Sequence, residues 1–116
     1  MSRKTGFWYF CMALLAPLPA LAGHGDPPVP DQPLIIDVRT TDEYQQGHVR
    51  EAVNIPFDEI ATHIIAVAPN HDARIVLYCR SGRRASIAEQ TLRQLGYQQV
   101  ENQGGLSDML RNGYSE

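Results

Sequence analysis

From Leu34 to the end of the chain, short apolar runs alternate with segments that carry apolar residues at helical spacing. The short, largely apolar segments at residues 34–38 and 73–79 have the character of buried strands, and we expect further strands at residues 52–55 and 97–102. Other segments carry apolar residues at helical spacing or helix-start signals, and we expect helices from Thr41 to a stop at Gly47 and at residues 57–68, 84–95 and 106–111. Strands that alternate with helices predict an α/β fold: a small, mostly parallel sheet with helices on both faces.

Two of the expected helices carry an apolar stripe that we expect to face the core. On the helix at 57–68 the stripe comprises Phe57, Ile60, Ala61, Ile64, Ile65 and Ala68. On the helix at 84–95 it comprises Ala85, Ala88, Leu92 and Leu95.

The N-terminal segment has the pattern of an export signal. A positive start, an apolar run at 7–16 and a small-residue site ending at Ala22 predict a secretory signal peptide over residues 1–22. The alternative, a membrane anchor, needs about 20 apolar residues without proline breaks. Residues 23–33 are rich in proline and predict an extended tether, which leaves one domain at 34–116. We therefore expect a periplasmic or secreted protein without a stable membrane anchor after cleavage.

Charge and cysteine content narrow the possible functions once the signal peptide is subtracted. The whole chain of 116 residues has a net charge of −3, which argues against nucleic-acid binding. Beyond residue 22 the chain carries eight arginines, no lysine, thirteen acidic residues and a single cysteine, Cys79. That thiol has no internal disulfide partner, so it is buried and inert, paired with another chain, or reactive.

Cys79 ends the most strongly predicted strand and opens the segment Cys79-Arg80-Ser81-Gly82-Arg83-Arg84. In open parallel sheets the working site lies at the carboxyl ends of the strands. Inward-pointing N–H groups and a following helix N-terminus bind anions and favour a thiolate, and Gly82 allows a backbone conformation closed to other residues. A core cysteine beside a solvated basic helix start is the alternative, but cations at a helix N-terminus oppose the helix dipole. Attack on a phosphate ester and attack on the outer sulfur of thiosulfate both suit this geometry.

Three stretches resemble the rhodanese-domain family. LIIDVRTTDEYQQGHVREAVNIP is similar to the family's N-terminal signature, LYCRSGRRA to its active-site loop and GYQQVENQGGL to its closing segment. The residues that match the N-terminal signature are Asp37, Arg39, Glu43, Tyr44, Gly47, His48, Ala52, Asn54, Ile55 and Pro56. The size and the export signal are most similar to the short periplasmic members of the phage-shock type. The resemblance covers residues 34–106 and implies a rhodanese-like fold.

The resemblance also implies roles for individual residues. Cys79 would be the nucleophile that holds a persulfide, and the donor would be bound by Arg80, Ser81, Gly82, Arg83 and Arg84. Asp37 and Arg39 would support the site through hydrogen bonds, with a purely structural ion pair as the alternative. Tyr44, Gly47, His48 and Asn54 are expected to be architectural.

The loop length separates the family from its phosphatase relatives, which place an arginine six positions after the cysteine. That position is Ala85 here, and the arginine is Arg84. Departures from the family pattern are Glu51, Ala85, Met109 and the absence of the usual opening strand and helix before Leu34.

We therefore expect a thiosulfate sulfurtransferase that passes a sulfane sulfur to cyanide or a thiol. A persulfide carrier or partner-binding module is the alternative, and a cysteine-dependent phosphatase is less favoured. We expect no cofactor and no metal, because one cysteine and four scattered histidines lack ligand spacing; the histidines are His24, His48, His63 and His71. The sequence leaves the physiological donor and acceptor open, as well as the choice between a monomer and a weak dimer.

Overall fold

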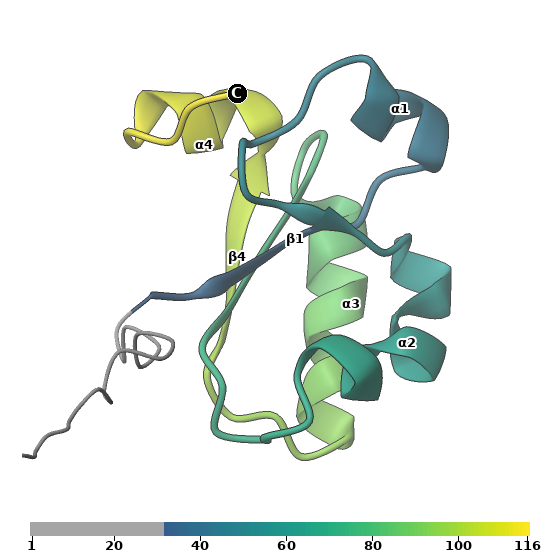
Figure 1. Cartoon of the computed structure of the whole chain (residues 1–116). Coiled ribbons are helices and arrows are strands. Elements are labelled where there is room, and N and C mark those ends of the chain that lie inside the picture. Colours follow the sequence, from purple (N-terminus) through teal and green to yellow (C-terminus); the bar gives the residue numbers. More distant parts are fainter. Residues whose placement is uncertain (1–31) are drawn as a thin grey trace, which may run out of the picture. The chain divides into compact units, whose positions relative to one another are not determined.

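Four parallel strands in the order β2-β1-β3-β4 form the sheet at the centre of residues 32–116, which this computed structural model describes (Figure 1). The strands are β1 (Leu34–Asp37), β2 (Val53–Asn54), β3 (Ile75–Cys79) and β4 (Val100–Gly105). The helices are α1 (Thr41–Gln45), the 3-10 helix η3 (Phe57–Glu59), α2 (Ile60–Val67), α3 (Arg83–Gln94) and α4 (Leu106–Arg111). The predicted signal peptide, and the predicted tether except for its last two residues, lie outside the described residues.

Helices cover both faces of the sheet, as predicted. Alternate side chains of a strand point to opposite faces, and β1 and β3 therefore contribute to two separate clusters. The first cluster joins the sheet to α2 and α3 through buried residues such as Ile36, Leu77, Cys79, Ile60, Ile64, Ala88 and Leu92. The second joins the opposite face to α4 and α1 through Ile35, Val76, Tyr78, Met109 and the half-buried Tyr44. The predicted α/β class is thus confirmed.

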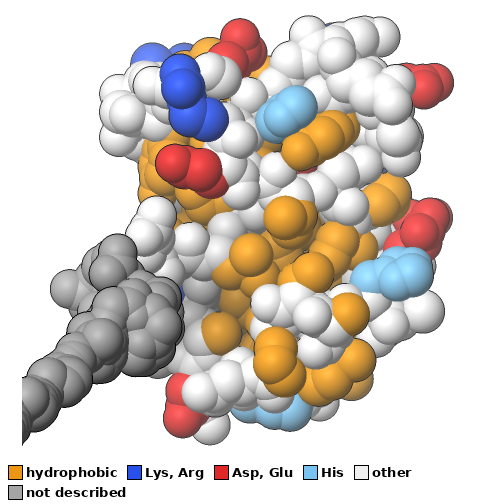
Figure 2. Space-filling view, viewed as in Figure 1, with side chains coloured by type: hydrophobic (Ala, Val, Ile, Leu, Met, Phe, Trp, Pro, Cys, Tyr) orange, Lys and Arg blue, Asp and Glu red, His pale blue; other side chains and the backbone are white. Residues whose placement is uncertain are grey.

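The apolar stripes of α2 and α3 are narrower than predicted. Ile65 is 54% exposed and Leu95 is 43% exposed, whereas Ile64 and Leu92 are buried. A helix buries only the side chains that face the sheet, and Ile65 lies about 100° around the helix from Ile64. Leu95 is the last residue before a turn at Gly96, and buried Tyr97 occupies the core beyond it. Figure 2 shows hydrophobic side chains on the face of the molecule where α2 lies in Figure 1.

Among the element boundaries, both ends of β4 differ most from the prediction of residues 97–102. Strand β4 begins at Val100 instead of residue 97, because Tyr97 packs in the core and its hydroxyl donates to the carbonyl oxygen of Ala68 at 2.5 Å. It also continues to Gly105, although a glycine pair is more typical of a turn. Of the helices in residues 32–116, none is long and apolar enough to cross a lipid bilayer.

Helix α1 begins at Thr41, as predicted, and Thr40 is its N-cap. The Thr40 hydroxyl accepts from the N–H of Glu43 at 3.2 Å, while the Glu43 carboxylate accepts from the N–H of Thr40 at 3.1 Å. This reciprocal capping box stabilises the N-terminus of a helix. It also fixes the Glu43 side chain at the start of α1.

Candidate active site

The carboxyl ends of β1, β3 and β4 bring the predicted site residues to one edge of the sheet. Cys79 ends β3 and pairs with Gly105 at the end of β4, and Asp37 ends β1 and pairs with Tyr78. Because the strands are parallel, the loops that follow them lie at the same edge. Residues far apart in the sequence therefore surround the cysteine.

The loop after Cys79 folds back on the sulfur atom. The N–H of Gly82 donates to Sγ of Cys79 at 2.9 Å, and the thiol residue itself is only 1% exposed. Gly82 has φ of +97°, a left-handed conformation that side chains rarely adopt, and it caps α3. The N-terminus of this twelve-residue helix thus lies at the loop, where its free N–H groups favour negative charge.

Two of the three loop arginines bind a carboxylate, that of Glu43. Arg84 donates to the two Glu43 oxygens at 2.8 and 3.1 Å, and Arg80 lies 3.6 Å from one of them. The hydrogen bonds from Arg84, together with those from Thr40, lower the pKa of Glu43 from 4.5 to about 2 despite partial burial. The same pairing raises the pKa of Arg84 above its ordinary value.

The three arginines differ in how freely a ligand can reach them. The side chain of Arg84 is 20% exposed, whereas that of Arg80 is 80% exposed. Arg83 is exposed, and it forms no ion pair with any other residue in 32–116. Sequence reasoning grouped the three as one anion-binding set and matched Glu43 only to the family pattern. The structure makes Glu43 the link between α1 and the loop.

Asp37 and Arg39 form a buried ion pair beside the loop. Nε of Arg39 donates to both carboxylate oxygens at 2.9 and 3.0 Å, and Nη2 donates to Oδ2 at 2.5 Å. Nη2 also donates to the carbonyl oxygen of Gly47 at 2.7 Å, and the guanidinium lies 5.6 Å from the centre of the Tyr78 ring. The pair therefore ties the end of β1 to the segment after α1.

The end of β4 forms the rear of the cysteine loop, and sequence reasoning missed this contact. A Cβ atom on Gly105 would lie 2.0 Å from the carbonyl oxygen of Arg80, so only glycine fits there without a backbone shift. Nδ2 of Asn102 donates to the carbonyl oxygen of Gly82 at 2.9 Å. A sequence signal for this contact is the pair Gly104-Gly105, which begins two residues after Asn102, because glycine inside a strand indicates a close backbone approach.

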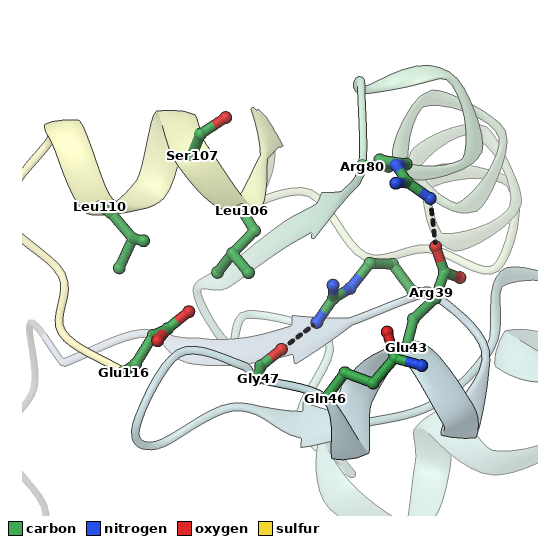
Figure 3. A pocket seen from close by; sticks show the side chains of 9 residues that line it. All are labelled: Arg39, Glu43, Gln46, Gly47, Arg80, Leu106, Ser107, Leu110 and Glu116. Carbon is green, nitrogen blue, oxygen red and sulfur yellow. Dashed lines mark hydrogen bonds and ion pairs between the residues drawn. The ribbon is translucent and has the colours of Figure 1, made fainter.

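A cavity of about 370 Å³ opens beside the loop (Figure 3). It lies between the end of α1, the cysteine loop and α4, and its lining comprises Arg39, Glu43, Gln46, Gly47, Arg80, Leu106, Ser107, Leu110 and Glu116. Arg80, the residue after the cysteine, connects the cavity to the loop. One wall is charged, and Leu106 and Leu110 of α4 make the other wall apolar.

The residues expected to be architectural make contacts within the scaffold. The Tyr44 hydroxyl donates to the carbonyl oxygen of Ala52 at 2.7 Å, and its ring stacks on His48 with centroids 3.6 Å apart. Nδ2 of Asn54 donates to the carbonyl oxygens of Asp37 and Arg39.

Of the departures from the family pattern, Ala85 and Met109 are fully buried in the core and Glu51 is exposed. Among residues 32–116, no group of three or more His, Cys, Asp or Glu could hold a metal ion.

Comparisons with known proteins agree with this geometry. A family model described as the rhodanese-like domain matches residues 21–111. Thiosulfate sulfurtransferase PspE of Escherichia coli is 42% identical over 74 residues, which cover 64% of this chain and 71% of PspE. A sulfurtransferase of Allochromatium vinosum is 36% identical over 81 residues, which cover 69% of this chain and 74% of that protein. The structure of a rhodanese with anions from E. coli has a TM-score of 0.64 at 40% identity and covers 66% of this chain and 91% of that one. The predicted rhodanese-like fold is confirmed.

Proposed function

The chain belongs to the rhodanese-like domain family and is a homologue of a thiosulfate sulfurtransferase, and on this premise we propose a persulfide mechanism at Cys79. The outer sulfur of thiosulfate would pass to Cys79 and then to cyanide or a thiol. The contact from the Gly82 N–H to Sγ supports this proposal most directly. A donor to sulfur, beside a helix N-terminus, stabilises the thiolate that attacks the substrate.

The first half-reaction needs no proton transfer. The thiolate of Cys79 attacks the outer sulfur of thiosulfate, a new S–S bond forms, and the S–S bond of thiosulfate breaks. Sulfite leaves with the electron pair of that bond as a stable anion. In the second half-reaction an acceptor anion attacks the outer sulfur of the persulfide, and the Cys79 thiolate leaves. This double displacement explains why a loop with one thiol and anion-binding groups is sufficient.

We divide the donor-binding role among the loop residues by their existing contacts. Arg83 is exposed, and the 3.6 Å contact of Arg80 with Glu43 is long, so both side chains are available to the oxyanion end of thiosulfate. Arg84 is held by two hydrogen bonds to Glu43, and it acts on the donor through the field of its charge. Backbone N–H groups from Ser81 to Arg84 complete the anion-binding set.

Asp37 and Arg39 support the site indirectly, because they fix the segment that carries Glu43. The ion pair is buried, and Arg39 also holds Gly47 at the other end of α1. Helix α1 therefore presents Glu43 to the arginines from a fixed position. We further propose that residues 1–22 direct export to the periplasm or the medium and are then removed.

Intact-mass spectrometry of the exported protein, with and without thiosulfate, tests these proposals together. We expect loss of residues 1–22, and after thiosulfate treatment a gain equal to one sulfur atom. Cys79→Ser is expected to gain no sulfur and to show no thiosulfate-to-cyanide turnover, because its hydroxyl is a far weaker nucleophile at neutral pH. A Cys79→Ser variant with undiminished turnover would refute the mechanism.

The same measurements separate the alternatives. A dedicated carrier gains the sulfur but turns over poorly with cyanide, whereas an enzyme releases thiocyanate over many cycles. A phosphatase hydrolyses an aryl phosphate and gains no sulfur from thiosulfate. The mass shift and the turnover number together assign one of these functions.

A further inference from the structure

The side-chain amide of Asn102 connects β4 to the glycine that contacts the sulfur. Nδ2 of Asn102 donates to the carbonyl oxygen of Gly82 at 2.9 Å. The N–H of the same Gly82 donates to Sγ of Cys79 at 2.9 Å. We propose that Asn102 is a positioning residue for sulfur transfer, which holds Gly82 in the conformation that directs its N–H to the sulfur. This inference rests on the function proposed for Cys79.

An irregularity in the sheet places the amide at the loop. Leu77 pairs with Asn102 and Cys79 pairs with Gly105, so β4 has one residue more than β3 over this stretch. Such a bulge redirects side chains away from the regular alternation of a strand. Oδ1 of Asn102 accepts from the N–H of Gly104 at 2.8 Å, and Gly104 has φ of +90°. One side chain therefore closes the bulge with its oxygen and holds the loop with its nitrogen.

Gly82 is the part of the loop that most needs an external contact. Glycine has the widest choice of backbone conformations, and no side chain caps α3 at this position. Its carbonyl oxygen accepts from the N–H of Ser86 at 2.9 Å, the first turn of α3, and from Asn102. The two donors fix Gly82 from the helix and from the sheet, and the direction of its N–H follows.

Loss of the Asn102 amide should affect the reaction at the sulfur more than the binding of thiosulfate. A hydrogen bond to a charged acceptor is stronger than one to a neutral acceptor, so the Gly82 N–H stabilises negative charge on the sulfur as it attacks the donor or leaves the persulfide. Asn102 is not among the residues that line the cavity, and its side chain hydrogen-bonds to Gly82 and Gly104. Its loss should therefore lower the rate of steps at the sulfur and leave thiosulfate binding nearly unchanged.

Alkylation of Cys79 by iodoacetamide, followed by peptide mass spectrometry at several pH values, tests the proposal. Asn102→Asp keeps the size and the acceptor for Gly104 but cannot donate, and Asn102→Ala removes the amide without adding charge. We expect both to react about tenfold more slowly than the wild type at pH 7, the effect of about 1.4 kcal/mol, and to approach its rate at high pH. We also expect kcat to fall by a similar factor, while KM for thiosulfate changes by less than about twofold.

Gln103→Ala is the matched control, because Gln103 lies in the same bulge and its side chain contacts Glu101 and Asn112 instead of the loop. It should react like the wild type. Folded Asn102 variants that alkylate at the wild-type rate at pH 7 would overturn the proposal. A slow rate that persists unchanged at high pH would also overturn it, because it reports lost access. If the wild type takes up no sulfur from thiosulfate, the proposed function fails, and the alkylation comparison still decides the role of Asn102.

Discussion

Replacing Glu43 by Gln should destabilise the domain in a way that depends on pH. Gln is nearly the same size as Glu and can serve in a capping box with Thr40. The substitution therefore removes mainly the negative charge that binds Arg84 and Arg80. Because this carboxylate joins α1 to the cysteine loop, its loss weakens a contact between two distant parts of the chain.

The pKa of Glu43 sets the size of the effect. A drop from 4.5 to about 2 corresponds to an upper limit of about 3 kcal/mol for the ionised carboxylate at neutral pH. The side chain is 21% exposed, solvent screens the pair, and Gln keeps neutral hydrogen bonds, so we expect a loss of about 1 to 2 kcal/mol. The pKa is lowered by folding, so this stabilisation is complete above pH 4.5 and declines as the pH falls toward 2.

Urea unfolding followed by far-UV circular dichroism, at pH 7 and pH 3, measures the difference. At pH 3 less than half of the stabilisation should remain, so the wild type and Glu43→Gln should approach each other. Glu89→Gln is the matched control, because Glu89 forms a more exposed pair with Arg93 within one helix, worth a few tenths of a kcal/mol. Equal differences between Glu43→Gln and the wild type at both pH values would refute the assignment of the effect to charge.

Two further comparisons test the loop and its rear wall. Gly105→Ala should lower the free energy of unfolding by more than about 2 kcal/mol, because its Cβ would lie 2.0 Å from a backbone oxygen. Gly113→Ala is the control, because its Cβ would meet open space and only its positive φ should cost free energy, about 1 kcal/mol. Similar losses for the two variants in urea unfolding would contradict the contact at Gly105. Arg83→Gln should raise KM for thiosulfate with an unchanged melting temperature, whereas Arg84→Gln should also lower the melting temperature, because a part-buried carboxylate loses its main partner. Identical thermal and kinetic profiles for the two variants would show that their contacts are equivalent.

Much of the fold follows from local pattern. The continuous apolar run at the end of β3 and the spacing of Ile60, Ile64 and Ala68 predict a buried strand and an amphipathic helix, and both are present. The predicted start of β4 was wrong, because a tyrosine such as Tyr97 is equally suited to a strand and to a single position in the core. Its hydroxyl finds the carbonyl of Ala68, a contact that depends on how α2 packs and that no local pattern encodes.

The place of Cys79 at the edge of the sheet could also be predicted from local pattern. A strand end, a basic loop and a helix start are adjacent in sequence, so their chemistry is visible there. The contacts of Glu43 with Arg84 and of Asn102 with Gly82 join residues that are 41 and 20 positions apart. They depend on strand order and on a bulge in β4, which are properties of the assembled sheet. The sequence therefore pointed to Cys79 and its basic loop as the candidate site, but it did not show the groups that hold the loop.

The bulged end of β4 has a consequence for the order of folding. The cysteine loop is translated before Asn102 and Gly105, and α1, which also holds it, is translated earlier still. Until β4 docks, the loop that contains Cys79 therefore lacks the hydrogen bond from Asn102 and the close backbone contact with Gly105. Under the proposed mechanism, formation of the reactive loop and completion of the sheet would then be one event, and a chain without β4 would carry the cysteine without the contacts that hold its loop.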